Sequence, residues 1–127
     1  MNHTRFLDCA FSVALCSPGV GQQRNFRLGA VLVDKKRIIA SGYNSMITHP
    51  KTLRWYKYPY LHAEAAVIFK RGLDYCEGSR LYLCRIKRDE SRALAKPCES
   101  CMALMESVGI KSVIYTLNEE EWEDLIP

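Results

Sequence analysis

Apolar positions recur with a helical period in some segments of the chain and gather into short β-type runs in others. Over residues 4–16 they fall on one stripe of a helix, and a Pro-Gly pair follows as a stop signal. The runs at 27–33 and 37–43 are rich in apolar and β-branched residues and are separated by a polar turn, so they predict a β-hairpin. A segment without a steady period follows at 44–60 and is expected to form a long loop.

The second half of the chain alternates helix and strand. The expected elements are a helix at 62–71, a strand at 80–86, a charged loop at 87–96, a helix at 98–108 and a strand at 111–116. Asn118 and Glu121 have the spacing of an N-cap residue and its N3 partner, so a last short helix is expected and a complete fifth strand is not. Alternating helices and strands predict an α/β layered domain with parallel pairing where a helix carries the crossover.

The composition is that of one folded domain. With 127 residues, of which 48% are hydrophobic and 25% charged, the chain 1–127 is long enough to bury a core and too apolar for a disordered segment. No apolar run approaches the roughly 20 residues of a membrane span. The first residues lack the basic leader and continuous apolar segment of a signal peptide. We therefore expect a cytoplasmic protein with no membrane partner.

The net charge of +4 hides a difference between the two halves of the chain. Residues 1–60 contain nine Lys and Arg against two acids, whereas residues 61–127 contain nine against twelve. A basic first half suits a ligand with phosphate groups or nucleic acid, and it also suits a solvated basic surface. In the expected long loop, Lys51, Arg54 and Lys57 stand among aromatic residues. This mixture suits the stacking of an extruded base, and equally a loop packed on the domain.

Six cysteines are present, and without an export signal they are expected to stay reduced. Cys9 and Cys16 fall on one face of the first helix and are expected to be small core residues. Cys76 and Cys84 have no partner at a metal-binding spacing. The Cys-x-x-Cys pair at 98–101 has such a spacing and, taken alone, suits a redox site or half of a structural zinc site.

The segment His62-Ala63-Glu64 stands at the start of the helix that precedes this pair. Two neighbouring β-α units bring their helix N-termini to one edge of the sheet, so we expect His62 within reach of Cys98 and Cys101. One imidazole and two thiolates are three ligands for a tetrahedral zinc ion and leave the fourth position open to water. Glu64 can stand beside that water as a proton acceptor. Taken alone, His62 also suits a structural role and Glu64 a favourable charge in a first helical turn.

The sequences His-Ala-Glu at 62–64 and Pro-Cys-Glu-Ser-Cys at 97–101, joined through a β-α arrangement, resemble the zinc-dependent cytidine and deoxycytidylate deaminase superfamily. The segments Thr-His-Pro at 48–50 and Tyr-Leu-His-Ala-Glu at 60–64 resemble those of short bacterial and phage members, and the resemblance to the superfamily runs over about residues 28–116. It implies a three-layer α/β/α cytidine deaminase-like fold, with a mixed sheet of four to five strands and both motif helices on one side. It also implies that His62, Cys98 and Cys101 hold Zn²⁺ and that Glu64 is the catalytic proton shuttle.

Three further positions follow from the same resemblance as substrate-binding residues. Asn44 matches an asparagine with which related deaminases hold the sugar or base, although it also suits a turn after a strand. The backbone N–H of Ala63 is placed at a helix start to bind an oxygen of the substrate. His49 is expected to contact a phosphate, although it also suits a plain surface position. A homo-oligomer is the expected assembly.

The implied activity is hydrolytic deamination of a cytosine nucleoside or nucleotide, in which a carbonyl replaces the amino group and ammonia leaves. Deoxycytidylate is the first choice of substrate because the first half of the chain is basic. One alternative is deamination of a base in nucleic acid, such as tRNA adenosine or single-stranded DNA cytosine, or of a free purine. Another is a non-catalytic zinc module with the same fold, against which the presence of Glu64 argues.

Overall fold

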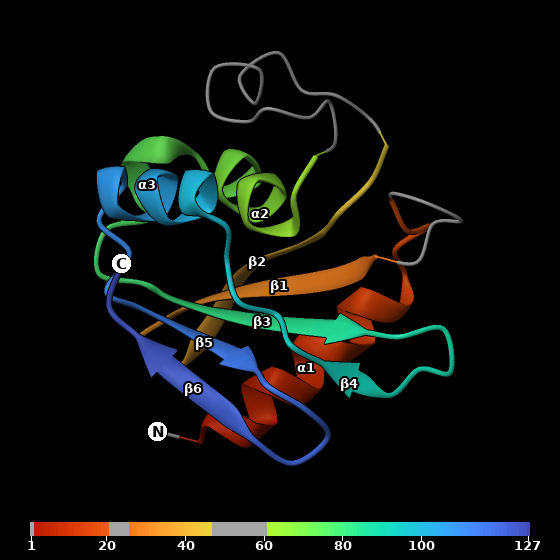
Figure 1. Ribbon diagram of the computed structural model, residues 1–127. Helices are drawn as coiled ribbons and strands as arrows, with labels where there is room; N and C mark the ends of the chain where they lie inside the picture. Colours follow the sequence, from red (N-terminus) through yellow and green to blue (C-terminus); the bar gives the residue numbers. More distant parts are fainter. Residues whose placement is uncertain (1, 21–25, 47–60) are drawn as a thin grey trace.

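The computed structural model describes residues 2–20, 26–46 and 61–127 (Figure 1). Its helices are α1 (His3–Leu15), α2 (Ala63–Arg71) and α3 (Glu99–Ser107), with a 3-10 turn η3 (Leu73–Tyr75). Its strands are β1 (Arg27–Asp34), β2 (Arg37–Tyr43), β3 (Arg80–Ile86), β4 (Arg92–Ala93), β5 (Ser112–Thr116) and β6 (Trp122–Leu125). Among the described residues, none of the helices combines the length and the apolar character needed to cross a membrane.

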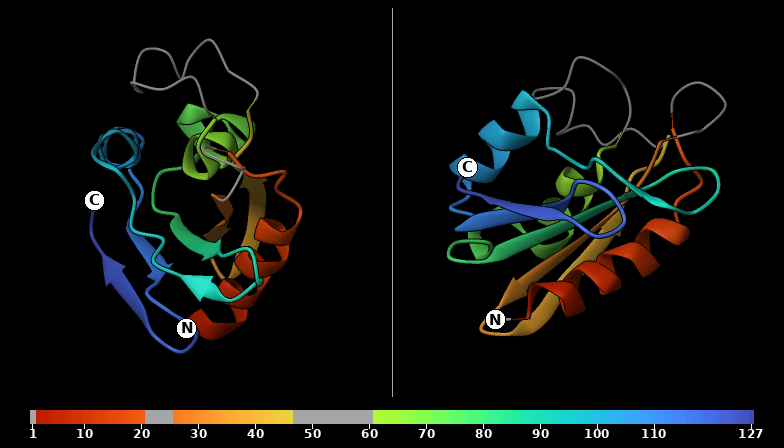
Figure 2. Two further views of the ribbon diagram at one scale, coloured as in Figure 1. Left: turned by 45° about the vertical axis from the view of Figure 1, so that its right-hand side comes forward. Right: turned by 60° about the horizontal axis from the view of Figure 1, so that its bottom comes forward.

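The strands form one mixed sheet with the order β2-β1-β3-β5-β6. The β1–β2 hairpin and the β1–β3 pair are antiparallel, whereas β3 and β5 are parallel. The short β4 lies off this path and pairs with residues 85 and 86 of β3, beyond the part of β3 that pairs with β5. Helix α1 covers one face of the sheet, and α2 and α3 cover the other (Figures 1 and 2). The expected three-layer α/β/α arrangement is therefore confirmed.

The two faces of the sheet bury two separate hydrophobic clusters because side chains of a strand alternate between faces. On the side of α2 and α3, Leu81 and Leu83 of β3 pack with Ile68 and Leu104. On the side of α1, Tyr82 and Cys84 of the same strand pack with a cluster that contains Phe6, Leu7, Ala10 and Ala14. Every residue named here is at most 4% exposed. Residues of β3 with odd numbers therefore face the two motif helices.

Two expectations about secondary structure are wrong, and both errors add a strand to the sheet. The segment 87–96, expected as a charged loop, contains β4, so that this part of the chain continues the edge of β3. The segment after Asn118, expected as a short helix, forms β6 antiparallel to β5. The sheet consequently has six strands rather than four to five.

The capping pattern at Asn118 forms a turn that reverses the chain. Oδ1 of Asn118 accepts hydrogen bonds from the backbone N–H groups of Glu120 and Glu121, both at 2.9 Å. The backbone N–H of Leu117 then donates to the carbonyl of Glu121 at 2.9 Å, which closes a hairpin instead of a first helical turn. Strand β6 is held on β5 by its ladder and by the hydroxyl of Tyr115, which donates to Glu123. Tertiary pairing thus overrides a local signal that fits a helix and a turn equally well.

The cysteines outside the 98–101 pair occupy three different environments. Cys76 and Cys84 are fully buried, and Cys9 is partly buried at the edge of the α1 cluster. Cys16 is exposed, so the expectation that it is a small core residue is wrong. Helix α1 ends at Leu15, and the position after its last turn no longer faces the sheet.

Helix α1 lies unusually close to β1 at Gly29. A Cβ atom built at Gly29 would stand 2.2 Å from the carbonyl oxygen of Ala10 and 2.3 Å from the backbone nitrogen of Ala14. Only glycine allows this approach, and alanines at both helix positions keep the facing side chains small. Arg27 at the start of β1 holds the end of the helix, since its Nη2 donates to the carbonyl of Leu15 at 2.7 Å.

Replacing Gly29 with Ala should destabilise the protein by roughly 3 kcal/mol or more, because backbone atoms of α1 would have to move. Gly78→Ala is the control: its Cβ meets nothing within 4 Å and its φ of +79° costs only about 1–2 kcal/mol. The free energy of unfolding in urea measures both effects. Equal losses in the two variants would contradict the close approach of α1 to β1.

Candidate active site and metal centre

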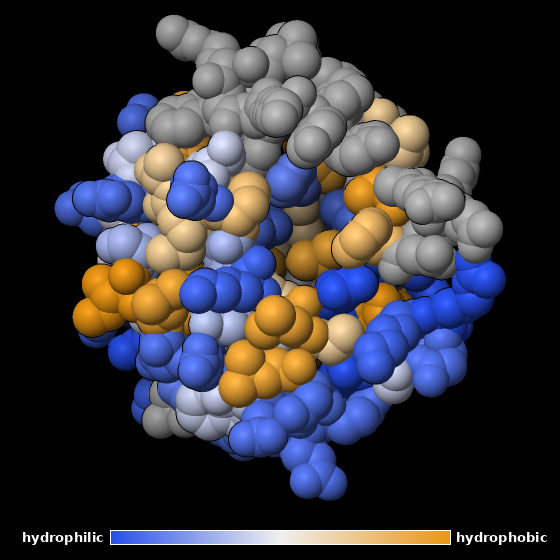
Figure 3. All heavy atoms as spheres, viewed as in Figure 1, coloured by the Kyte–Doolittle hydropathy of each residue, from blue (hydrophilic) through white to orange (hydrophobic). Residues whose placement is uncertain are grey.

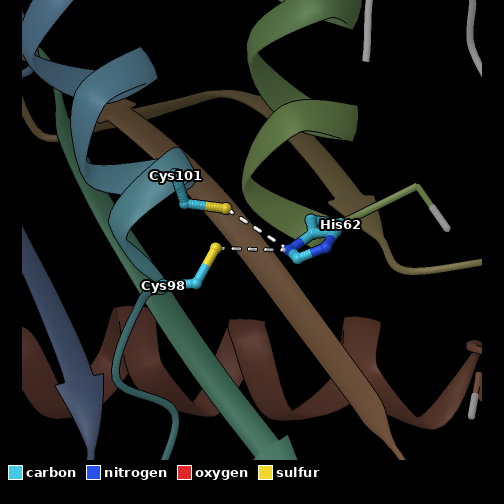
Figure 4. A group of neighbouring side chains, drawn as sticks. All are labelled: His62, Cys98 and Cys101. Carbon is cyan, nitrogen blue, oxygen red and sulfur yellow. Dashed lines mark hydrogen bonds between the residues drawn. The ribbon is translucent and has the colours of Figure 1, made fainter. Parts of the chain in front are cut away.

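The N-termini of α2 and α3 lie side by side at one edge of the sheet. His62 is the N-cap residue of α2 and Cys98 is the N-cap residue of α3, both with extended backbone angles. Neither side chain caps its own helix. Instead, the His62 ring and the two cysteine side chains of α3 point toward one another (Figure 4). The edge that the paired motifs predicted is therefore the place where the three side chains meet.

The three donor atoms of His62, Cys98 and Cys101 all lie within 4.8 Å of one another. Nδ1 of His62 is 3.8 Å from Sγ of Cys98 and 3.5 Å from Sγ of Cys101 (Figure 4). Tetrahedral zinc with bonds of about 2.0–2.3 Å separates its ligand atoms by roughly 3.5 Å. One nitrogen and two sulfurs at this spacing suit a zinc ion.

The group contains three donors among the residues that the structure describes, and the other buried cysteines are elsewhere. Cys76 lies beyond the far end of α2, where its thiol donates to the carbonyl of Gly72 at 3.3 Å. Cys84 faces α1 on the opposite side of the sheet. A three-donor group leaves one position of a tetrahedral metal for a water or a substrate atom, as in catalytic rather than structural zinc sites.

Electrostatic interactions within the group favour the thiolate form of Cys98. A hydrogen bond with Cys101, followed by one with His62, lowers the pKa of Cys98 from 9.0 to about 4, although burial opposes the change. Burial lowers the pKa of His62, but the hydrogen bond with Cys98 and the charge of Glu64 outweigh it, and the net change is upward. Thiolate is the form of cysteine that binds metals, so the Cys98 sulfur is prepared for coordination.

Glu64 stands in the first turn of α2 and is only 3% exposed. Burial raises the pKa of its carboxyl group, and hydrogen bonds to the backbone and the neighbouring His62 and Cys101 offset this rise only in part. A carboxyl group with a raised pKa accepts a proton near neutral pH more readily than an ordinary surface glutamate. The acid in the first turn of α3, Glu99, is by contrast exposed.

A cavity of about 430 Å³ opens beside these side chains and is lined by His62, Ala63, Glu64 and Cys98. Its other walls are mostly apolar, with Val20, Phe26, Leu28, Leu61, Leu94 and Ala95. Asn44, Arg85 and Lys96 are the remaining polar side chains of the lining. Figure 3 shows a hollow near the centre of this face, where hydrophobic and hydrophilic side chains meet. Pockets of roughly 300–1,000 Å³ with a few polar groups are typical of small-molecule sites.

The side chain of Asn44 is engaged mainly with the protein itself. Its Oδ1 accepts hydrogen bonds from the hydroxyl of Ser17 at 2.6 Å and from the backbone N–H of Leu28 at 2.9 Å. Its Nδ2 donates to the carbonyl of Phe26 at 2.7 Å. Asn44 is 2% exposed, and it ties the end of β2 to the end of α1 and the start of β1. It therefore shapes one wall of the cavity.

Of the other predicted substrate-binding positions, Ala63 lines the cavity at the first turn of α2. Backbone N–H groups in a first helical turn have no acceptor within the helix. His49 lies outside the described residues, and so do Lys51, Arg54 and Lys57 of the expected long loop. Phe26, Arg85 and Lys96 also line the cavity, and the sequence did not predict them as site residues. Arg85 could have been recognised as a candidate from the sequence, because it is a cation inside the otherwise apolar run of β3.

Several solved structures with a similar fold are deaminases. A dCMP deaminase from the cyanophage S-TIM5 aligns with a TM-score of 0.65 and 21% identity, over 91% of this chain and 82% of that one. A cytidine deaminase from Burkholderia pseudomallei aligns with a TM-score of 0.70 and 16% identity, over 99% and 93%. At such identities the likeness shows the fold.

A third similar structure is a diaminohydroxyphosphoribosylaminopyrimidine deaminase/5-amino-6-(5-phosphoribosylamino)uracil reductase from Thermotoga maritima. It aligns with a TM-score of 0.55 and 26% identity, over 89% of this chain but only 28% of that one. No curated protein sequence matches the chain. The model of the cytidine and deoxycytidylate deaminase zinc-binding region matches residues 1–117. The chain therefore belongs to the cytidine and deoxycytidylate deaminase family.

Proposed function

We propose that the protein is a zinc-dependent hydrolytic deaminase of a cytosine nucleoside or nucleotide, with deoxycytidylate as the first choice of substrate. The observation that carries the proposal is that a buried carboxyl group, Glu64, lines the same cavity as His62 and Cys98 of the three-donor group. Family membership indicates a hydrolytic deaminase, and the similar structures act on different substrates.

His62, Cys98 and Cys101 are the proposed zinc ligands, since their donor atoms have the spacing and chemistry that zinc requires. Bound there, zinc supplies a Lewis acid that lowers the pKa of a water in the open position to about 7. The helices hold the three side chains in place through the hydrophobic cluster below them, which includes Cys101 itself. The ligands are thus set by the same packing that stabilises the domain.

Glu64 is the proposed proton carrier. Burial raises the pKa of its carboxyl group, so it can take a proton from the attacking water and release it again within one turnover. It delivers that proton to the ring nitrogen beside the reacting carbon and then assists protonation of the amine. The oxygen of water forms the new bond to carbon, the carbon–nitrogen bond breaks, and ammonia leaves.

The apolar walls of the cavity suit the faces of a pyrimidine ring, since they bury it without competing for its polar edge. The backbone N–H of Ala63 is the proposed donor to an oxygen of the base. Asn44 is proposed to contribute through the wall that it holds in place, and it has a second amide N–H to offer to the sugar or base. The role of His49, the homo-oligomer, the single domain 1–127 and the cytoplasmic location stay predictions.

The isolated protein should bind one equivalent of Zn²⁺ per chain. Cys101→Ser should lose this zinc because a neutral hydroxyl replaces one of the two thiolates. Cys16→Ser is the matched control, since Cys16 is exposed and lies outside the donor group. Metal content after dialysis, measured by elemental analysis, checks both variants. Full zinc content in Cys101→Ser would contradict the assignment of the ligands.

The proposed activity is tested by measuring ammonia release from a panel of amino-bearing compounds by the zinc-loaded protein. The panel includes cytidine, deoxycytidine and their monophosphates, adenosine and guanine, and short single-stranded RNA and DNA. We expect turnover of a cytosine nucleoside or nucleotide. Release of ammonia only from the oligonucleotides or only from the purines would transfer the proposal to the corresponding alternative. No release from any compound would refute the enzyme itself.

Glu64→Gln should lower kcat by about 10²–10⁴ because the amide cannot carry the proton. Zinc content should stay at one equivalent, since Glu64 does not belong to the three-donor group. Glu99→Gln is the matched control: it makes the same change in the first turn of the other motif helix, at an exposed position. Steady-state kinetics and metal analysis of both variants provide the measurements. Undiminished turnover in Glu64→Gln would overturn the proposed mechanism.

A further inference from the structure

Arg85 is a cation placed on the active-site face of the sheet. It follows Leu81 and Leu83 in the odd-numbered series of β3, which faces α2 and α3. It stands near the end of β3, opposite Leu28 of β1 on one side and Ala93 of β4 on the other. At this point the series leaves the hydrophobic cluster and reaches the cavity, which Arg85 lines together with Leu28.

The guanidinium group of Arg85 is held against the ring of Phe26, with Cζ 4.7 Å from the ring centroid. Stacking of this kind orients the planar group and leaves its N–H edge available for an anion. The Nε atom is buried and has no hydrogen-bond partner in the part of the chain that the structure describes. A buried donor without a partner is costly, and more so when it belongs to a charged group.

Arg92, on the neighbouring strand β4, has a structural role, and its contacts can be compared with those of Arg85. It also lies over a phenylalanine, with Cζ 4.8 Å from the Phe11 centroid. In addition, its Nη2 donates to the carboxylate of Asp8 at 2.7 Å. The ion pairs found among the described residues are this one and His3–Asp124, and neither includes Arg85. Arg85 stacks on the ring of Phe26 in a similar way, but among the described residues no carboxylate forms an ion pair with it.

We propose that Arg85 binds the phosphate group of a nucleoside monophosphate whose base is held at His62 and Glu64. The inference rests on the proposed function and deepens it from a cytosine compound in general to a nucleotide. A phosphate has the charge and the oxygen geometry that an arginine fork binds in two parallel hydrogen bonds. Lys96 lines the same cavity from an exposed position and adds a second positive charge.

The lining of the cavity combines apolar side chains with positive charge. Arg85 and Lys96 line it together with His62, Glu64 and Cys98, and Leu28 and Ala95 also belong to it. A nucleoside without phosphate would leave the Arg85 guanidinium buried beside an uncharged ligand. Arg85 is thus a specificity-determining residue, which discriminates between a nucleotide and its nucleoside.

The first test is binding, because it does not depend on turnover. Isothermal titration calorimetry of the zinc-loaded protein compares deoxyuridylate with deoxyuridine, which differ only by the phosphate. We expect the unmodified protein to bind deoxyuridylate at least about tenfold more tightly, and Arg85→Gln to lose this preference. Arg85→Lys should retain part of it, since the charge stays while the fork is lost.

Lys87→Gln is the matched control for the loss of one positive charge. Lys87 follows directly after β3, is exposed and does not line the cavity, so the preference for deoxyuridylate should persist in this variant. If Arg85→Gln and Lys87→Gln had the same preference for deoxyuridylate over deoxyuridine, the inference would be overturned. The overall positive charge of the protein would then account for the preference. Equal affinity of the unmodified protein for deoxyuridylate and deoxyuridine would overturn it as well.

The second test is the ratio of kcat/KM for deoxycytidylate to that for deoxycytidine. Arg85→Gln should lower the ratio at least about tenfold through the deoxycytidylate value, with deoxycytidine little changed. A loss shared equally by both substrates would refute a role in phosphate binding. The protein could instead deaminate cytosine in a single-stranded oligonucleotide efficiently and leave deoxycytidylate unchanged. If that turnover depended on Arg85, the residue would bind a phosphodiester, and the proposal of a nucleoside monophosphate would be refuted.

A third measurement separates a ligand-binding residue from a structural one. Arg85→Met keeps most of the side-chain volume and removes the unpaired buried donor, so the melting temperature of the ligand-free protein should stay the same or rise. A clear fall, like that expected for breaking a structural ion pair, would contradict the inference. If no compound of the panel is deaminated, the proposed activity fails, whereas the calorimetric comparison still decides whether Arg85 binds phosphate.

Discussion

Residues 80–83 of β3 pair in parallel with residues 112–115 of β5, and a parallel pair cannot be joined by a tight turn. The chain has to return along the length of the sheet, and it does so through α3, while α2 leads into β3 from the same side. Both helices therefore start at the same edge. The meeting of His62 with Cys98 and Cys101 is a consequence of this pairing, since residues 36 and 39 positions apart in the chain have no local reason to meet.

The parts of the site that the sequence predicted are those for which residue type and topology agree. The group of His62, Cys98 and Cys101 could be predicted because all three side chains can bind zinc. In addition, neighbouring β-α units bring the N-termini of both helices to one edge of the sheet. Glu64 followed from its place beside them. Asn44 was predicted to hold the sugar or base of a substrate, and that role stays a prediction. Its bonds to Ser17, Leu28 and Phe26 depend on three segments whose approach no single window of sequence encodes.

The parts that the sequence did not predict depend on contacts between distant segments. Asn118 forms the hydrogen bonds of a cap, yet β5 offers an unpaired edge on which the following residues form a ladder, and this outweighs a helix of one or two turns. Strand β4 is only two residues long and sits in a highly charged segment, so no periodicity marks it. Cys16 was misplaced because it shares a helical face with Cys9 and not with the buried residues Leu7, Ala10 and Ala14 of α1.

The short ladder between β3 and β4 sets the side of the sheet toward which Arg92 of β4 points. Its two registered pairs, Arg85 with Ala93 and Ile86 with Arg92, put one guanidinium toward the cavity and the other toward α1. A shift of this pairing by one residue would turn Arg92 to the cavity side, because side chains alternate along a strand, whereas Arg85 is held by the longer pairing of β3 with β1. Two residues alone hold such a register weakly, and here it is secured from outside, by Asp8 on Arg92 and by the Thr116 hydroxyl on the carbonyl of Ala93. The second guanidinium group is therefore kept on the α1 side by residues that lie on α1 and on a third strand, so that Arg85 alone of these two arginines lines the cavity.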